Sequence, residues 1–196
     1  MMEYNSATNV AHFPIEEAMP IYSSNESELL EELAESANAA ECLLCAYDVL
    51  EDMLDAVLKS IFHKDDYAVK FVVDPLLSGN GPLGETLVRI KLLLGLGVIN
   101  KETYDDIEVF VTLKEWVKVQ DGKLDFWDQD VIFELNRIHA IQKIMPIDYS
   151  PELVEGLNTD MKSMFLDRHF QKVRSTIVLA VNDIHQQLSK DNALTS

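Results

Sequence analysis

Hydrophobic residues recur every three or four positions along most of the chain, which is the spacing of amphipathic helices. One long stretch of this kind covers residues 27–62, which contain neither glycine nor proline. The same spacing predicts shorter helices over 82–94, 101–117 and 129–143, and a long last helix over 150–188. The sequence therefore predicts an all-α fold, a multi-helix bundle in which long first and last helices flank shorter ones.

Several polar residues and prolines indicate where these helices begin. Such residues favour the cap or the first turn of a helix, and here they are Asp65 or Asp66, Pro82, Asn100, Asp128 and Ser150. Pro75 is expected to close a short helical segment over 67–73, and Asp121-Gly122 is a turn signal.

The chain is predicted to form one domain. Residues 1–25 lack sustained periodicity and are expected to form a flexible arm, residues 26–190 a single helical domain, and residues 191–196 a tail. The length of 196 residues is typical of one globule. No apolar run approaches the roughly 20 residues of a membrane span, and no leader segment is evident, so a cytoplasmic location is expected.

The charge of the chain bears on whether it binds nucleic acid. Thirty-four Asp and Glu against 16 Lys and Arg give a net charge of −18. Residues 1–60 hold thirteen of the acids and only one base, Lys59. Such a surface repels phosphate and disfavours general, backbone-driven binding of nucleic acid.

One segment satisfies the pattern G-x-G-x-x-G, with Gly79, Gly81 and Gly84 at the glycine positions. A dinucleotide site needs a strand before this loop and a βαβ unit around it, and neither is predicted. A turn in which glycine supplies positive φ and Pro82 starts the next helix is the simpler interpretation. A small anion at the start of that helix, beside Arg89, is the alternative.

The cysteines and histidines give no catalytic or metal site. Cys42 and Cys45 lie within a predicted helix among leucines and are expected to face the core or its boundary. His63 precedes Asp65 and Asp66 at a helix break, where capping explains the acids. No catalytic residue, metal site or cofactor is predicted.

Two features bear on DNA binding. The helices 82–94 and 101–117 resemble a helix-turn-helix, but the second helix carries more acids than bases, which disfavours reading of the major groove. The last helix carries the better basic feature, a possible contact patch of Arg168, Lys172 and Arg174. Salt bridges or a solvated face would explain these bases, and also Arg89, equally well.

Three runs of sequence resemble the mannitol operon repressor family: FHKDDYAVK (62–70), DPLLSGNGPLG (74–84) and VRIKLLLGLGVI (88–99). The run VRSTIVL (173–179) is similar to the last helix of that family. Within the motif, the candidate residues for an interaction or an anion are Asp65, Asp66, Ser78, Gly79, Gly81, Pro82, Gly84 and Arg89.

The resemblance implies a cytoplasmic negative regulator of the genes for mannitol uptake and oxidation, with no catalytic residues to carry over. Because the charge disfavours direct DNA contact, the sequence favours repression through protein partners, whose identity it does not give. The alternatives are an operator-binding repressor that acts as a homodimer, and a sensor of a sugar phosphate or small anion that uses the 79–84 loop with Arg89.

Overall fold

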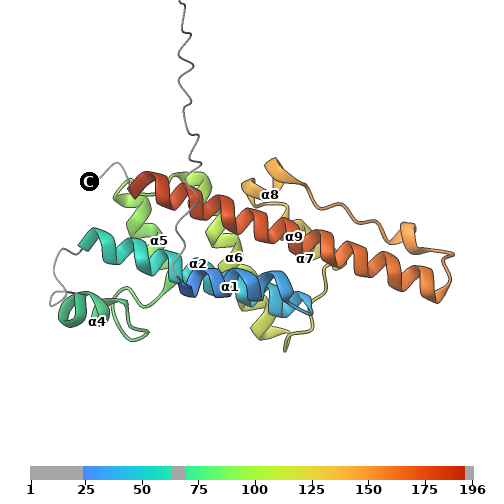
Figure 1. Cartoon of the computed structure of the whole chain (residues 1–196), viewed down its shortest axis with the longest axis horizontal. Coiled ribbons are helices and arrows are strands. Elements are labelled where there is room, and N and C mark those ends of the chain that lie inside the picture. Colours follow the sequence, from blue (N-terminus) through green and yellow to red (C-terminus); the bar gives the residue numbers. More distant parts are fainter. Residues whose placement is uncertain (1–23, 63–68, 193–196) are drawn as a thin grey trace, which may run out of the picture.

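A computed structural model describes residues 24–62 and 69–192 of the chain (Figure 1). Within these ranges the chain is helical and contains no strand, as predicted. The long helices are α1 (Ser24–Glu35), α2 (Ala39–Phe62), α6 (Lys101–Val119) and α9 (Thr159–Asn192). The predicted arm up to residue 23, the candidates Asp65 and Asp66, and residues 193–196 lie outside the described ranges.

Short elements connect the long helices. They are the π-helix η1 (Val69–Val73), α4 (Asp74–Leu77), α5 (Thr86–Gly95), α7 (Gln129–Leu135), α8 (His139–Ile144) and the 3-10 helix η2 (Pro151–Val154). Pro75 therefore lies in the first turn of α4 and does not close the segment before it. No helix of the described part is long and apolar enough to cross a membrane.

The core lies where α2, α6 and α9 meet. Each of these helices contributes fully buried aliphatic or aromatic side chains, among them Leu43, Leu50, Leu54, Phe110, Leu113, Ile177, Val181 and Ile184. Cys42 and Cys45 are buried in the same core, as expected. The seven buried residues of α6 place this helix inside the bundle.

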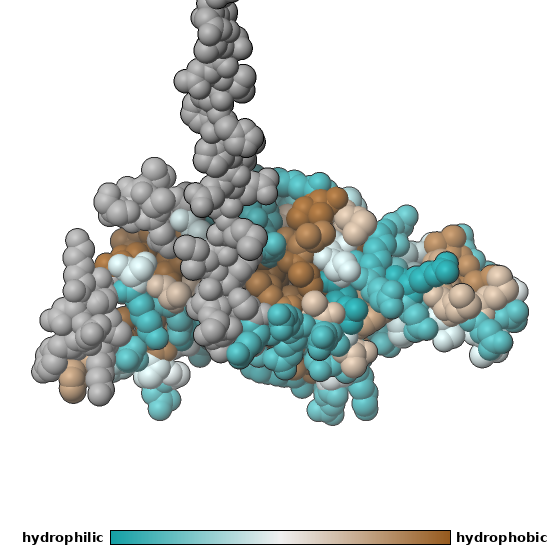
Figure 2. Space-filling model, in the orientation of Figure 1, coloured by the Kyte–Doolittle hydropathy of each residue, from teal (hydrophilic) through white to brown (hydrophobic). Residues whose placement is uncertain are grey.

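The helix α9 extends past the bundle at its N-terminal end, next to the segment that leads into it (Figure 1). Figure 2 shows apolar side chains among hydrophilic ones at this end of the molecule. The apolar spacing of the predicted last helix places Met161 on its inward face with Leu157, Phe165, Val173, Ile177, Val181, Ile184 and Leu188, but Met161 is 53% exposed, because the bundle does not reach it. The members of this stripe from Val173 to Leu188 are buried, whereas Leu157 and Phe165 are partly buried.

The predicted first helix over 27–62 is wrong in one respect, since it is two helices. Ser36 donates to the carbonyl of Leu33, and Asn38 Oδ1 accepts from Glu41 N at 2.9 Å. Glu41 in turn accepts from Ala37 N at 2.7 Å. Side chains that bond their own backbone compete with a continuous helix, so α1 ends here and α2 starts from an Asn–Glu capping arrangement.

The predicted helix start at Pro82 is also wrong, because the helix α5 begins at Thr86. Residues 81–84 fold back on α4, where Gly81 N donates to Ser78 O at 2.7 Å and Leu83 N to Leu76 O at 2.9 Å. The carbonyls of Leu83 and Gly84, which a helix starting at Pro82 would use, instead accept from the side chain of Arg89.

The predicted helix over 129–143 divides into α7 and α8. Asn136 lies between them and forms two hydrogen bonds with the backbone of Ile147, at 2.7 and 2.9 Å. Asp106 of α6 then accepts from the first two backbone amides of α8, those of His139 at 2.7 Å and Ala140 at 3.1 Å. A helix start that is capped from another helix leaves no local signal in the sequence.

The last helix begins later than the predicted residue 150. Pro151 starts only the short η2, and Gly156 adopts φ +78°, which interrupts the helix. Asn158 then accepts from Met161 N at 2.8 Å and begins α9. The predicted cap of α6 is confirmed, because Asn100 accepts from Thr103 N at 2.9 Å.

Candidate functional site

Arg89 holds the family-motif loop to α2. Its side chain is 5% exposed, and its Nη1 lies 2.6 Å from Oδ1 of Asp55 and 3.5 Å from Oε1 of Glu51. Its Nε donates to the carbonyl of Leu83 at 2.6 Å, and its Nη2 donates to that of Leu77 at 2.8 Å. All three guanidinium nitrogens therefore have acceptors within the protein, which favours a structural role for Arg89 over an open anion site.

The loop glycines serve close backbone packing. A Cβ at Gly81 would lie 2.4 Å from the carbonyl oxygens of Pro75 and Leu76, and one at Gly84 would lie 2.6 Å from that of Ser78. Neither glycine has a positive φ, so the predicted reason for them was wrong even though the predicted turn is present. Gly79 has open space around its Cα.

The three predicted basic residues of α9 do not form one patch. Arg174 donates to the carbonyl of Ser36 at 2.8 Å and lies over the ring of Phe170, so it supports the junction of α1 and α2. Arg168 and Lys172 are exposed and share a face of α9. Their role as a contact patch stays a prediction.

Helix α6 corresponds to the second helix of the helix-turn-helix that the sequence resembles. Its packing in the core limits which of its side chains could contact DNA. Its buried side includes Phe110 and Leu113, which pack in the core. Asp106 is also buried, and it accepts from His139 Nδ1 at 2.7 Å as well as from the backbone of α8. The partly exposed part of α6 includes Asp105 and Glu108, which carry the wrong charge for phosphate.

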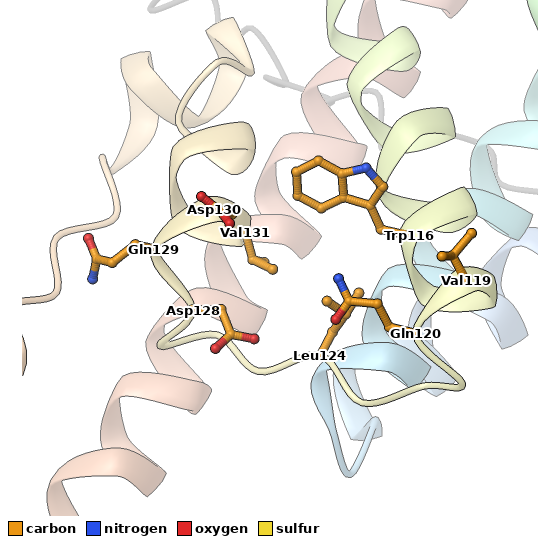
Figure 3. A pocket seen from close by; sticks show the side chains of 8 residues that line it. All are labelled: Trp116, Val119, Gln120, Leu124, Asp128, Gln129, Asp130 and Val131. Atoms are coloured by element: carbon orange, nitrogen blue, oxygen red, sulfur yellow. The ribbon is translucent and has the colours of Figure 1, made fainter.

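Sequence reasoning missed a groove between the end of α6 and the start of α7 (Figure 3). Its volume is about 560 Å³, and it is lined by four apolar and four polar side chains: Trp116, Val119, Leu124, Val131, Gln120, Asp128, Gln129 and Asp130. The positive φ of Asp121 and Gly122 turns the chain at the end of α6. Buried Leu124 then anchors the returning segment. The only local signal was the Asp121-Gly122 turn.

Figure 3 shows how the groove residues lie. Trp116 of α6 and Val131 of α7 lie on opposite sides of the space between the two helices, and Asp128 lies at its rim. Val119, the last residue of α6, is 83% exposed. The groove thus presents apolar side chains beside two carboxylates.

The residues that line this groove include two carboxylates, those of Asp128 and Asp130. Burial and the Asp128 carboxylate raise the pKa of Asp125 above its usual range. The Asp128 carboxylate is oriented by the backbone amide of Asp125, at 3.1 Å. No lysine, arginine or histidine is among the residues that line the groove. A partner that brings a cation would therefore be stabilised here.

Over residues 24–62 and 69–192, the fold and these surfaces define a helical, acidic protein that has a partly apolar groove and no exposed basic helix suited to reading DNA. A profile of the mannitol repressor family matches residues 25–189, and the chain belongs to that family. It is 33% identical over 168 residues to the mannitol operon repressor of Escherichia coli strain K12, which covers 86% of this chain and 84% of that protein.

Two further relatives add to this finding. The fold superposes on the X-ray structure of the MtlR–HPr complex from Escherichia coli with a TM-score of 0.70 and 32% identity, covering 85% of this chain and 99% of that chain. The chain is also 31% identical over 117 residues to fumarase E of Escherichia coli strain K12, covering 58% of this chain and 69% of that protein.

Proposed function

We propose that this protein is a cytoplasmic negative regulator of mannitol uptake and utilisation genes, and that it acts through a protein partner. The observation that carries the proposal is the likeness to a family member that is solved as a complex with HPr. HPr, or a protein of its kind, is accordingly the proposed partner.

The distribution of charge supports a partner over direct reading of DNA. The net charge is −18, and α6 is packed into the core. Arg89 and Arg174 donate to acceptors within the chain. Of the basic residues predicted to contact DNA, Arg168 and Lys172 are exposed. Two cations neutralise few of the phosphates of an operator.

Binding to an operator tests this proposal. Fluorescence anisotropy of the purified chain is measured with a mannitol operator fragment and with a scrambled fragment, near 150 mM salt. We expect the chain to bind neither fragment specifically. Specific binding near ~10⁻⁸ M, which is usual for operators, would overturn the proposal and favour the operator-binding dimer.

The likeness to fumarase E raises an enzymatic alternative. Fumarate carries two carboxylates, so a site for it needs cations. The groove between α6 and α7 instead contains Asp128 and Asp130 and is lined by no cation, so it repels a dicarboxylate. The groove is therefore unsuited to fumarate, and we propose that the chain is not an enzyme. Formation of malate from fumarate by the purified chain above the buffer rate would contradict this.

A further inference from the structure

A second groove lies between α1 and α9, two helices that pack on each other (Figure 1). The volume of this α1–α9 groove is about 270 Å³. It is lined by one residue of α1 and four of α9: Ala34, Arg174, Ser175, Val178 and Leu179. Leu179 is 45% exposed, although a leucine side chain gains from leaving water. Residues 24–62 and 69–192 therefore leave part of this apolar lining open to solvent.

The charge around the α1–α9 groove is opposite in sign to that of the chain as a whole. Residues 168–182, which include the groove residues of α9, contain no Asp or Glu and three bases: Arg168, Lys172 and Arg174. Among the described residues, no carboxylate forms an ion pair with any of these bases. Four glutamates of α1 line a different hollow, which they share with Glu41 of α2. The groove therefore favours an occupant that combines apolar groups with negative charge.

The chain carries a segment of this complementary kind before α1. Residues 13–17 have the sequence Phe-Pro-Ile-Glu-Glu, which places apolar side chains directly beside two carboxylates. Residues 1–23 as a whole contain three glutamates and no lysine or arginine. These residues lie outside the described ranges, and the family profile matches residues 25–189. The segment is therefore a feature that the family profile does not include.

The chain before α1 is long enough to bring this segment to the groove. Ala34 lies ten residues after Ser24, the first residue of α1, which is a rise of about 15 Å along the helix. The residues from Glu17 to Ser24 span up to about 23 Å when extended, at roughly 3.3 Å per residue. A short tether of this kind gives an effective concentration of about a millimolar, so even weak contacts favour occupancy of the groove.

We infer that residues 13–17 dock in the α1–α9 groove of the same molecule. The apolar side chains of this segment cover Leu179, and its two carboxylates lie beside Arg174 and Lys172. The docked segment also covers part of the stretch of α9 that carries bases and no acid. The inference goes beyond the proposed function and does not depend on the identity of the partner.

Charge and size favour this occupant over others. A second copy of the chain carries −18, which opposes the association of two such molecules. A nucleic acid carries one charge per phosphate over a long surface, so it would meet acids of the chain on either side of the groove. A segment of five residues brings only two carboxylates and fits within the basic stretch.

Formation of an intramolecular disulfide between introduced cysteines tests the inference in the full chain. The groove pair is Ala18→Cys/Ser175→Cys. The control pair is Ala18→Cys/Ser189→Cys, whose second cysteine lies at another exposed position of α9. Each protein is incubated below micromolar concentration with oxidised glutathione, and mass spectrometry follows the closed disulfide. We expect the groove pair to close at least tenfold faster than the control pair.

The role of charge is tested in the same groove pair. Adding Glu17→Lys replaces one of the two carboxylates with a cation, so we expect closure to slow at least threefold. The matched control is Glu3→Lys, which makes the same change of charge in residues 1–23 but outside the docking segment. We expect the control to close within twofold of the unchanged groove pair. Circular dichroism of every variant confirms that the fold is kept.

The remaining outcomes overturn the inference. Equal rates for the groove pair and the control pair would mean that the segment does not prefer this groove. A rate that Glu17→Lys leaves unchanged, or that Glu3→Lys lowers equally, would remove the charge pairing. A disulfide that joins two chains, seen as a dimer on a nonreducing gel, would favour a second copy as the occupant. None of these measurements involves HPr, so the proposed function stands or fails separately.

Discussion

Replacing Arg89 by methionine removes the guanidinium and keeps most of the aliphatic length of the side chain. In the wild type this buried group faces the carboxylates of Asp55 and Glu51. It also donates to the carbonyls of Leu77 and Leu83. The substitution leaves two acids without their cation and the loop without its tie to α2.

The size of the loss follows from the exposure of these groups. Breaking a fully buried ion pair by removing one partner costs about 3–5 kcal/mol. Here the side chains of Glu51 and Asp55 are 33% and 30% exposed, so water partly replaces the lost cation. With the loss of the hydrogen bonds to buried carbonyls, we expect the free energy of unfolding to fall by about 3 kcal/mol.

Urea unfolding followed by far-ultraviolet circular dichroism measures this loss. Arg89→Lys is the control, because a single ammonium keeps the charge but cannot bond the carboxylates and both carbonyls together. We expect it to lose about half as much stability as Arg89→Met. A fall of less than about 1 kcal/mol for Arg89→Met, which is an ordinary value for a point mutation, would refute the role assigned to this arginine.

Two further predictions concern the glycine loop and the buried cysteines. Gly84→Ala places a Cβ 2.6 Å from a backbone oxygen, so we expect a loss of about 1–3 kcal/mol in urea unfolding. Gly79→Ala, which meets nothing within 4 Å, is the control and should change stability by less than about 0.5 kcal/mol. Burial raises the pKa of Cys42 to about 12, so its thiolate is scarce at pH 8 and iodoacetamide should label it only in urea. Mass spectrometry measures the labelling, and rapid modification of Cys42 in the native protein would contradict the prediction.

The sequence predicted the class of fold because the core is built from long amphipathic stripes. The stripe from Val173 to Leu188 is buried as the spacing indicated. Met161 continues the same spacing but is exposed, since periodicity marks one face of a helix and not how far its neighbours extend. Helix boundaries failed where the decisive contacts are remote, as at α8, which Asp106 caps from α6.

The candidate site was harder to predict for a physical reason. The motif residues Gly81, Gly84 and Arg89 could be picked out in the sequence. Their contacts show that they stabilise a turn. The groove combines Trp116 with Asp128, which no short motif joins. Only the turn at Asp121 brings these residues together, so the surface could not be recognised before the fold was known.

The central claim is that repression runs through a partner protein and not through direct contact with DNA. A reporter gene behind a mannitol operon promoter tests this in cells that make the wild type or the basic variant Arg168→Ala/Lys172→Ala. We expect the basic variant to repress as the wild type does. Loss of repression in the basic variant would contradict the account.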